Sequence, residues 1–234
     1  MPMDTSRHLL INGMTIEKQK KLNNSKILVI GAGGLATPAL SYLVMAGVGQ
    51  VTIVDFDIIE ASNLHRQTLY TPDDLGKHKA EVAKHYLLTR APDAKIKAIN
   101  EKLDDKRLLA QIYQHDIVLD CTDDRAVSYQ INDCAVAANK PVVFANASEM
   151  SGQLFVMLPN DEKTITFRTL WNETSEKNTT VPTGIIGPIP GMMGSLQALE
   201  TIKVLTGFSP VNESSLYHID FIHLSIHQIA ITPI

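Results

Sequence analysis

The chain has 234 residues, of which 44% are hydrophobic and 20% are charged, and its formal net charge at pH 7 is −4. This composition is typical of a globular protein with an ample core, and the weak net charge gives no reason to expect a nucleic-acid or membrane partner. The first residues lack the basic start and apolar run of a signal peptide, and two cysteines are too few for a disulfide framework. We therefore expect a cytoplasmic protein whose thiols stay reduced.

After a short helical arm predicted over residues 4–24, the chain carries a regular series of structural signals. An apolar run at residues 27–30 predicts a strand buried on both faces. A glycine-rich turn follows, then apolar residues at helical spacing over residues 37–47, then a second apolar run at residues 51–54 that ends on Asp55. Strand, glycine turn, helix, strand and acidic residue in this order are the fingerprint of a mononucleotide-binding βαβ unit.

Each part of that unit has a physical role. Gly31 permits the tight turn out of the strand, and Gly33 lacks a Cβ, so that a phosphate can approach the backbone. Gly34, together with Ala36, allows the helix and the strand to lie close together. Asp55 is placed to accept a hydrogen bond from a ribose hydroxyl. The alternative is a glycine turn that serves packing alone.

Strands and helices continue to alternate up to residue 147, which predicts an α/β fold: a Rossmann-like, mostly parallel sheet with helices on both faces. The predicted helices cover residues 77–90, 104–113 and 125–139, and the predicted strands cover residues 95–100, 116–120 and 141–146.

The pattern changes in the second half, which predicts an extension of the sheet by antiparallel strands. The predicted strands cover residues 153–158, 164–167, 216–221 and 224–231, and a helix covers residues 194–206. We interpret residues 1–234 as one domain, with an arm over 1–25, a Rossmann-like nucleotide-binding half over 26–147, an antiparallel half over 148–234 and a polar crossover loop near 170–183.

A second set of polar residues follows the βαβ unit. Asn63 and Arg66 lie in the loop after the second strand, and Lys79 lies on the next helix. Asp123 comes just after a predicted strand, and ligands of open α/β sheets bind outside the carboxyl ends of strands. Two cations suit a triphosphate, and a carboxylate beside phosphates suits Mg²⁺. The set therefore indicates ATP with magnesium rather than a dinucleotide.

Each of these residues also has a purely structural interpretation. Arg66 could form a surface ion pair, Lys79 could be a solvated helix residue, and Asp123 could cap the helix that follows it. Asp124 is the better candidate for that cap. Asp57 is a further candidate at the cofactor site, where we expect it to support the loop rather than to touch magnesium.

The chain resembles the ThiF/MoeB/HesA family, the bacterial relatives of ubiquitin-activating enzymes, over nearly its whole length. The resemblance rests on the motifs Arg-His-Leu-Leu, Gly-Ala-Gly-Gly-Leu-Ala, Asp-Phe-Asp, Ser-Asn-Leu-His-Arg-Gln, Gly-Lys-x-Lys-Ala, Asp-Cys-Thr-Asp and Gly-Ser-Leu-Gln-Ala-Leu-Glu. It implies that ATP and magnesium are held at Asp55, Asn63, Arg66, Lys79 and Asp123, with Mg²⁺ at Asp123. The position matching Arg7 reaches the ATP of the neighbouring subunit, so the resemblance also implies a homodimer with two composite sites.

The reaction implied by the resemblance is adenylation of a C-terminal glycine carboxylate on a small ubiquitin-like sulfur-carrier protein. The carboxylate attacks the α-phosphate of ATP, pyrophosphate leaves and an acyl-adenylate remains, so positioning and charge neutralisation do the catalytic work. By resemblance, Arg7 and Arg66 would stabilise the triphosphate and the leaving pyrophosphate. Lys79 would hold phosphate oxygens, and Asp123 would hold Mg²⁺.

Two departures from the family narrow this expectation. Thr166–Thr169 stands where many members carry the first Cys-x-x-Cys pair of a structural zinc site, so no zinc is expected. Thr180 stands where many members carry the cysteine that forms a thioester or persulfide. Cys121 and Cys134 are expected to be structural. We therefore expect adenylation without a covalent step on this chain.

Three alternatives stay open. The carboxylate could belong to a peptide or a small molecule of a specialised biosynthetic pathway. The chain could be a non-catalytic, nucleotide-binding homologue. An NAD-dependent oxidoreductase would explain the glycine turn and Asp55, but it would leave Arg66, Lys79 and Asp123 without a role.

Overall fold

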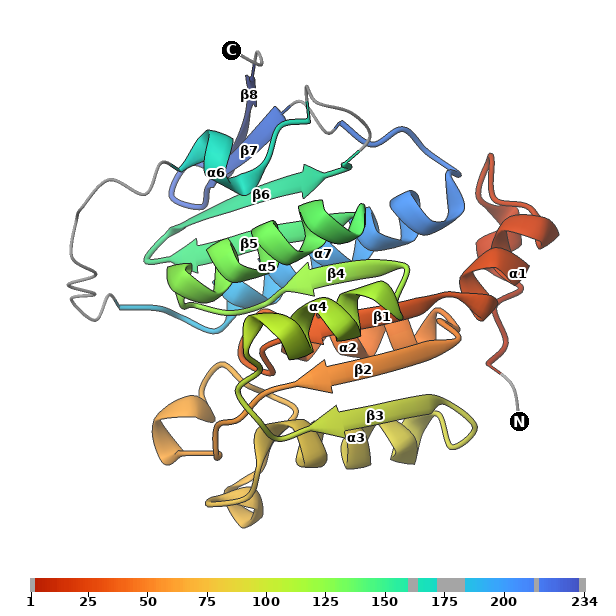
Figure 1. The fold of residues 1–234 in the computed structure, drawn as a ribbon. Helices are drawn as coiled ribbons and strands as arrows, with labels where there is room; N and C mark the ends of the chain where they lie inside the picture. Colours follow the sequence, from red (N-terminus) through yellow and green to blue (C-terminus); the bar gives the residue numbers. More distant parts are fainter. Residues whose placement is uncertain (1–2, 160–163, 172–183, 213–214, 232–234) are drawn as a thin grey trace.

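The structure, a computed structural model, describes residues 3–159, 164–171, 184–212 and 215–231. Within these ranges, eight strands form one sheet in the order β3-β2-β1-β4-β5-β6-β7-β8 (Figure 1). The strands are β1 (Lys26–Ile30), β2 (Gln50–Val54), β3 (Lys95–Ile99), β4 (Ile117–Asp120), β5 (Val142–Ser148), β6 (Ser151–Met157), β7 (Ser215–Asp220) and β8 (Ser225–Ala230). The helices are α1 (Ile16–Asn24), α2 (Ala36–Met45), α3 (Lys79–Arg90), α4 (Asp105–Tyr113), α5 (Arg125–Ala138), α6 (Phe167–Leu170) and α7 (Pro188–Thr206), with 3-10 turns η1 (His8–Leu10), η2 (Ala61–Asn63) and η3 (Pro72–Asp74). No helix in the described ranges is long and apolar enough to cross a membrane.

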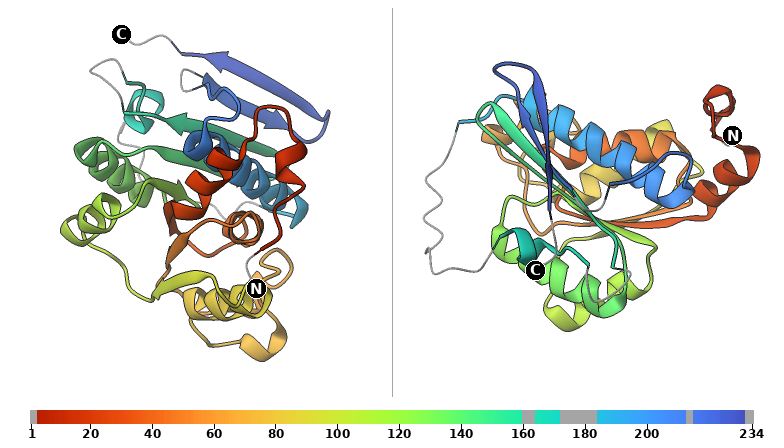
Figure 2. Two further views of the ribbon diagram at one scale, coloured as in Figure 1. Left: turned by 90° about the vertical axis from the view of Figure 1, so that its right-hand side faces the viewer. Right: turned by 90° about the horizontal axis from the view of Figure 1, so that it is seen from above.

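The sheet separates two apolar cores. Helices α2, α3 and α7 cover one face, and α4, α5 and α6 cover the other (Figure 2). In β1, Ile27 and Val29 belong to the first core, whereas Leu28 and Ile30 belong to the second. Both faces of this strand are therefore buried, which is why its sequence is a continuous apolar run without alternation.

Strands β1 to β5 run parallel, and β1 lies between β2 and β4. The chain leaves β1 toward β2 and β3 on one side and then returns to β4 and β5 on the other. These strands end at the same edge of the sheet, where the loop after β2 also lies (Figure 1). In open α/β sheets, the ligand crevice lies at the carboxyl ends of the strands at such a switch point. The predicted Rossmann-like sheet with an antiparallel extension is confirmed.

The predicted strand at residues 164–167 is wrong. Phe167 begins α6, because the hydroxyl of Thr166 accepts a hydrogen bond from the backbone N–H of Thr169 at 3.2 Å and caps the helix. Strand β6 instead pairs antiparallel with β5 on one side and with β7 on the other, so neither of its edges is left for a further strand. The other predicted strands of the second half correspond to β6, β7 and β8.

Helix α7 begins at Pro188, earlier than the predicted start at residue 194. Proline is well tolerated in the first turn because the N–H that it lacks would have no partner in the helix. The helix lies directly against α2 and the sheet. A Cβ on Gly194 would lie 2.0 Å from the carbonyl oxygen of Leu35, and a Cβ on Gly152 of β6 would lie 2.3 Å from the sulfur of Met193.

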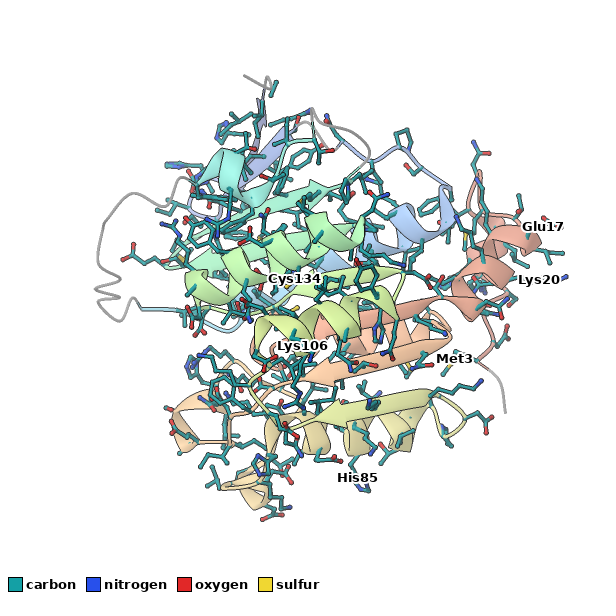
Figure 3. The ribbon with its side chains drawn as sticks, in the orientation of Figure 1. Met3, Glu17, Lys20, His85, Lys106 and Cys134 are labelled. Carbon is teal, nitrogen blue, oxygen red and sulfur yellow. The ribbon has the colours of Figure 1, made fainter. Side chains whose placement is uncertain are left out.

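The N-terminal arm lies at the opposite edge of the sheet from the ends of the parallel strands (Figure 1). Its helix α1 leads directly into the start of β1 and is anchored by Leu22, which is fully buried. The ammonium group of Lys18 donates to the carbonyl oxygen of Gly207 at 3.1 Å, beyond the end of α7. Glu17 and Lys20 point away from the sheet (Figure 3).

Candidate active site

The glycine turn joins β1 to α2 at the switch point. Gly31 has a φ of +92°, and a Cβ there would lie 2.6 Å from the carbonyl oxygen of Cys121 after β4, so only glycine fits. At Gly33, by contrast, a Cβ would meet only one side-chain atom, at 3.5 Å, so this side of the turn is open to a ligand. The sequence predicts close packing of the helix and a strand at Gly34, but a Cβ there would lie 3.1 Å from Pro190, so this glycine lies close to α7 instead.

Asp55 connects the end of β2 to the glycine turn. It is 9% exposed, and its two carboxylate oxygens accept hydrogen bonds from the backbone N–H groups of Ala32 at 2.6 Å and Asp57 at 2.8 Å. Burial raises the pKa of Asp55, although both hydrogen bonds act in the opposite direction. The acidic residue of the predicted βαβ unit therefore lies against the glycine turn, where a ribose-binding carboxylate belongs.

Lys79 is a buried cation in the first turn of α3, with a side chain that is only 8% exposed. Its Nζ lies 2.9 Å from Oδ2 of Asp57, whose side chain is half exposed, and its backbone N–H donates to the carbonyl oxygen of Asp57 at 3.0 Å. Lys79 is therefore not a solvated helix residue, and Asp57 supports the loop. An ammonium group has three donors, so Lys79 can bind a phosphate oxygen without releasing Asp57.

Asn63 and Arg66 belong to the loop that follows Asp55. The side-chain oxygen of Asn63 accepts from the backbone N–H of Glu60 at 3.1 Å and closes η2. The guanidinium of Arg66 donates to the carbonyl oxygen of Ser62 at 2.8 Å, and it has no acidic partner within the described residues. Arg66 is therefore not part of a surface ion pair in the described structure, and its charge can act on an anionic ligand.

Two neighbouring aspartates after β4 have different positions. The carboxylate of Asp124 accepts from the backbone N–H of Ala126 at 2.9 Å and caps α5. Asp123 is exposed, and it lines a cavity of about 130 Å³ together with Thr122 and Arg125. The helix-cap interpretation therefore applies to Asp124, and Asp123 lines the cavity instead.

Sequence reasoning missed two polar side chains at this edge of the sheet, Gln67 near Gly33 and Asn100 beside Asp55. The side-chain oxygens of Gln67 and Asn100 are the buried polar atoms that have no hydrogen-bond partner within the described structure. Gln67 follows Arg66 directly, and Asn100 follows β3, beside Asp55 in the strand register. Unpaired buried acceptors are costly in an empty site, but a ligand that carries hydroxyl or amino donors would satisfy them. An ionised phosphate carries no such donors, so it would leave both acceptors unpaired.

Asp120 is a third residue that sequence reasoning missed. It is 2% exposed, and its carboxylate accepts hydrogen bonds from the backbone N–H and hydroxyl of Thr122 and from the hydroxyl of Ser128. Burial raises the pKa of Asp120 to about 6, despite these hydrogen bonds. The sequence carried one signal for Asp120, namely its position as the last residue of a predicted buried strand.

The structure does not bring Arg7 to the other candidate residues. Arg7 is exposed and precedes η1, and His8 of that turn is joined to Gln19 of α1 by a hydrogen bond of 3.0 Å. The arm lies at the opposite edge of the sheet from the glycine turn (Figure 1). Arg7 therefore cannot complete the site of its own subunit in this arrangement.

Both cysteines of the chain are buried and unpaired. The thiol of Cys121 contacts the side chain of Gln197 at 3.4 Å, and the thiol of Cys134 contacts the carbonyl oxygen of Asp105 at 3.6 Å. Burial raises the pKa of Cys121, and it raises the pKa of Cys134 to about 11. Thr180 lies outside the described residues. In the ranges that are described, no three His, Cys, Asp or Glu side chains form a cluster suited to a metal ion.

The fold and these residues define a Rossmann-like protein with a candidate nucleotide site at the switch point of its sheet. Residues 5–233 match the ThiF family. The chain is 40% identical, over 217 residues, to the sulfur carrier protein ThiS adenylyltransferase of Escherichia coli K12, and the match covers 92% of this chain and 86% of that protein. It is also 40% identical, over 204 residues, to the molybdopterin-synthase adenylyltransferase of the same organism, with coverage of 87% and 82%. The chain belongs to the ThiF family.

A solved structure agrees with this fold. The crystal structure of E. coli MccB with MccA-N7isoASN is similar to this chain, with a TM-score of 0.83 and 24% sequence identity. The similarity covers 92% of this chain and 67% of the MccB chain.

Proposed function

We propose that this chain is an ATP-dependent adenylyltransferase that activates the C-terminal glycine carboxylate of a small ubiquitin-like sulfur-carrier protein. The observation that carries the proposal is the cluster around the glycine turn. It joins a buried carboxylate, Asp55, to a buried cation, Lys79, through the loop that also holds Arg66. Two ThiF-family relatives are named as adenylyltransferases, one of the sulfur carrier protein ThiS and one of molybdopterin synthase, and both names support the same reaction.

The site residues fit ATP by their chemistry. Gly33 leaves the turn open toward phosphate, and Asp55 with the unpaired oxygens of Gln67 and Asn100 can accept hydrogen bonds from the nucleoside. Lys79 would hold phosphate oxygens without giving up Asp57. These contacts would place the triphosphate beside the ends of β1 and β4.

In the reaction, an oxygen of the substrate carboxylate bonds to the α-phosphorus of ATP, and the bond between the α-phosphorus and the bridging oxygen breaks. The products are an acyl-adenylate and pyrophosphate. Arg66 and Lys79 would neutralise the negative charge of the leaving pyrophosphate. Asp123, which lines the 130 Å³ cavity, would hold Mg²⁺, which would neutralise charge on the phosphates.

The proposal includes a homodimer in which Arg7 acts on the site of the partner subunit. Three apolar residues next to Arg7 support it, since Leu9, Leu10 and Ile11 are 39%, 74% and 50% exposed. A groove of about 580 Å³ between α2, α3 and the start of α7 is lined in part by Arg66. A partner arm lying in this groove would cover apolar surface and bring a second arginine to the phosphates.

We also propose that the reaction stops at the acyl-adenylate and needs no zinc. The raised pKa values of Cys121 and Cys134 make both thiols poor nucleophiles, since the thiolate is the reactive form. A thioester between this chain and its substrate that is cleaved by excess thiol or hydroxylamine would contradict this part of the proposal. The one-domain organisation of residues 1–234 and a cytoplasmic location stay predictions.

The test is ATP–pyrophosphate exchange with purified protein. The probes are the sulfur carrier ThiS, a carrier variant that lacks the last glycine, a peptide that ends in Gly-Gly and a panel of small acids. We expect exchange with intact ThiS that requires Mg²⁺ and the terminal glycine. Exchange with peptides or small acids alone would move the substrate to the alternative class. ATP binding without exchange would indicate a non-catalytic homologue, and binding of NAD in place of ATP would overturn the proposal.

A further inference from the structure

Helix α6 depends on α5 for its existence. It has only four residues, and a helix of one turn is unstable by itself. The backbone N–H of Phe167 donates to the side-chain oxygen of Asn132 at 2.8 Å, in a buried contact between the two helices. Thr166–Thr169, at the start of α6, stands where we expected the cysteine pair of a zinc site in other family members. Contacts with α5 therefore fix this segment of the chain.

A second contact orients α6. The guanidinium of Arg168 donates two parallel hydrogen bonds to the carboxylate of Asp133, from Nε to Oδ1 at 2.6 Å and from Nη2 to Oδ2 at 2.7 Å. The guanidinium also lies 4.8 Å above the centre of the Tyr129 ring. The two side chains of the ion pair are 38% and 51% exposed, so it adds little stability, but its two-point geometry fixes an orientation.

Aromatic contacts extend from this ion pair to the candidate active site. The ring of Tyr129 meets Phe167 edge-on at 5.2 Å, and its hydroxyl donates to the carbonyl oxygen of Trp171 at 3.0 Å. Phe167 lies 4.5 Å from Trp171 and 4.9 Å from Phe144, measured between ring centres. Phe144, Phe167 and Trp171 line the same cavity as Asp123. The contacts are therefore continuous from α5 to the cavity wall.

We propose that Arg168 is a positioning residue. Through its ion pair with Asp133, it holds Phe167 and Trp171 as one wall of the cavity. The end of the substrate meets Asp123 in this cavity. This inference rests on the proposed adenylation. The cavity, at about 130 Å³, is smaller than the roughly 300–1,000 Å³ of a typical small-molecule site. It suits the narrow end of a chain, and a displaced aromatic wall would weaken binding of that end while leaving the nucleotide site intact.

The experiment uses the only tryptophan of the chain, Trp171, as a reporter of the wall. The variants are Arg168→Gln, Asp133→Asn and the charge-swapped pair Asp133→Arg with Arg168→Asp. The matched control is Arg107→Gln on α4, which removes an ion pair with Glu101 of similar exposure. Each protein is assayed for ATP–pyrophosphate exchange with ThiS and for acrylamide quenching of its fluorescence.

We expect Arg168→Gln and Asp133→Asn to raise KM for ThiS about tenfold, with KM for ATP unchanged and Trp171 more accessible to acrylamide. The charge-swapped pair should recover part of both signals. Unchanged quenching and unchanged KM for ThiS in Arg168→Gln would overturn the inference, and so would an equal rise of KM for ATP or an equal effect in Arg107→Gln. If wild-type protein shows no exchange with any probe, the proposed function fails. The quenching data then still decide whether Arg168 holds the wall.

Discussion

The side-chain amide of Gln197, in the middle of α7, donates a hydrogen bond to the carbonyl oxygen of Asp120 at 2.7 Å. Gln197 is completely buried, and it also donates to the carbonyl oxygen of Val143 at 3.1 Å. One side chain therefore pairs backbone groups of both β4 and β5 with α7. Because Asp120 is the last residue of β4, this contact fixes the point from which the chain continues to Asp123. The late helix motif is thus a structural support of the candidate site.

The carboxyl group of Asp120 should make stability depend on pH. Burial raises the pKa of Asp120 to about 6 from a model-compound value of 3.8. Because the folded pKa lies above the unfolded one, the contribution to stability is fully present below about pH 4 and is lost as pH rises through about 6. Relative to wild type, Asp120→Asn should therefore gain about 3 kcal/mol of unfolding free energy between about pH 4 and pH 7.

Urea unfolding of wild type and Asp120→Asn across this pH range measures the difference directly. Asp116→Asn provides a comparison, since it removes another carboxyl group near the start of the same strand. Parallel stability curves for Asp120→Asn and wild type would contradict the raised pKa of Asp120.

Substitutions of Asp123 and Asp124 should have different effects, the first on catalysis and the second on stability. Asp123→Ala removes the proposed magnesium ligand, so exchange should fall about 100-fold or more. Its melting temperature should stay close to that of wild type because the side chain is exposed. Asp124→Ala removes the cap of α5, which should cost about 1 kcal/mol while leaving most of the exchange activity. Exchange assays and thermal melts of the two variants would contradict these roles if the effects were reversed.

Mixed dimers should show whether Arg7 acts across an interface. Arg7→Ala and Asp123→Ala should each be inactive as homodimers. When the two are co-expressed, the mixed dimer has one site with an intact Asp123 and an intact Arg7 from the partner. With random pairing, about half of the dimers are mixed, and each of these has one intact site of two. About a quarter of the wild-type activity per site should therefore return. No recovery in purified mixed dimers would place Arg7 outside the partner's site.

Alanine substitutions at two glycines of α7 should change the free energy of unfolding in opposite directions. Gly194→Ala places a Cβ within 2.0 Å of the carbonyl oxygen of Leu35, so α2 and α7 must separate. We expect a loss of roughly 1–3 kcal/mol. A Cβ on Gly191 meets nothing within 4 Å, and Gly191→Ala should stabilise the helix by about 0.5–1 kcal/mol. Urea unfolding measures both, and a neutral Gly194→Ala would contradict the close helix contact.

Much of the first half could be predicted from sequence because its signals are local. The apolar run of β1, the positive φ required at Gly31 and the acidic residue after β2 each follow from the chemistry of a few neighbouring residues. Residues 164–167 show the limit of this reasoning. A short stretch of alternating apolar and threonine residues is compatible with a strand or a capped helix, and here the contacts of Phe167 with Asn132 and the surrounding aromatic rings decided for the helix.

The sequence by itself determined the ThiF-family resemblance, the order of strands and helices in the nucleotide-binding half and the residue types of the candidate site. These depend on periodicity and spacing, which are properties of the chain. Only the tertiary structure decided that Lys79 is buried against Asp57, and that Arg7 lies at the opposite edge from the glycine turn. Burial and pairing arise between elements distant in sequence, so no local pattern could assign them.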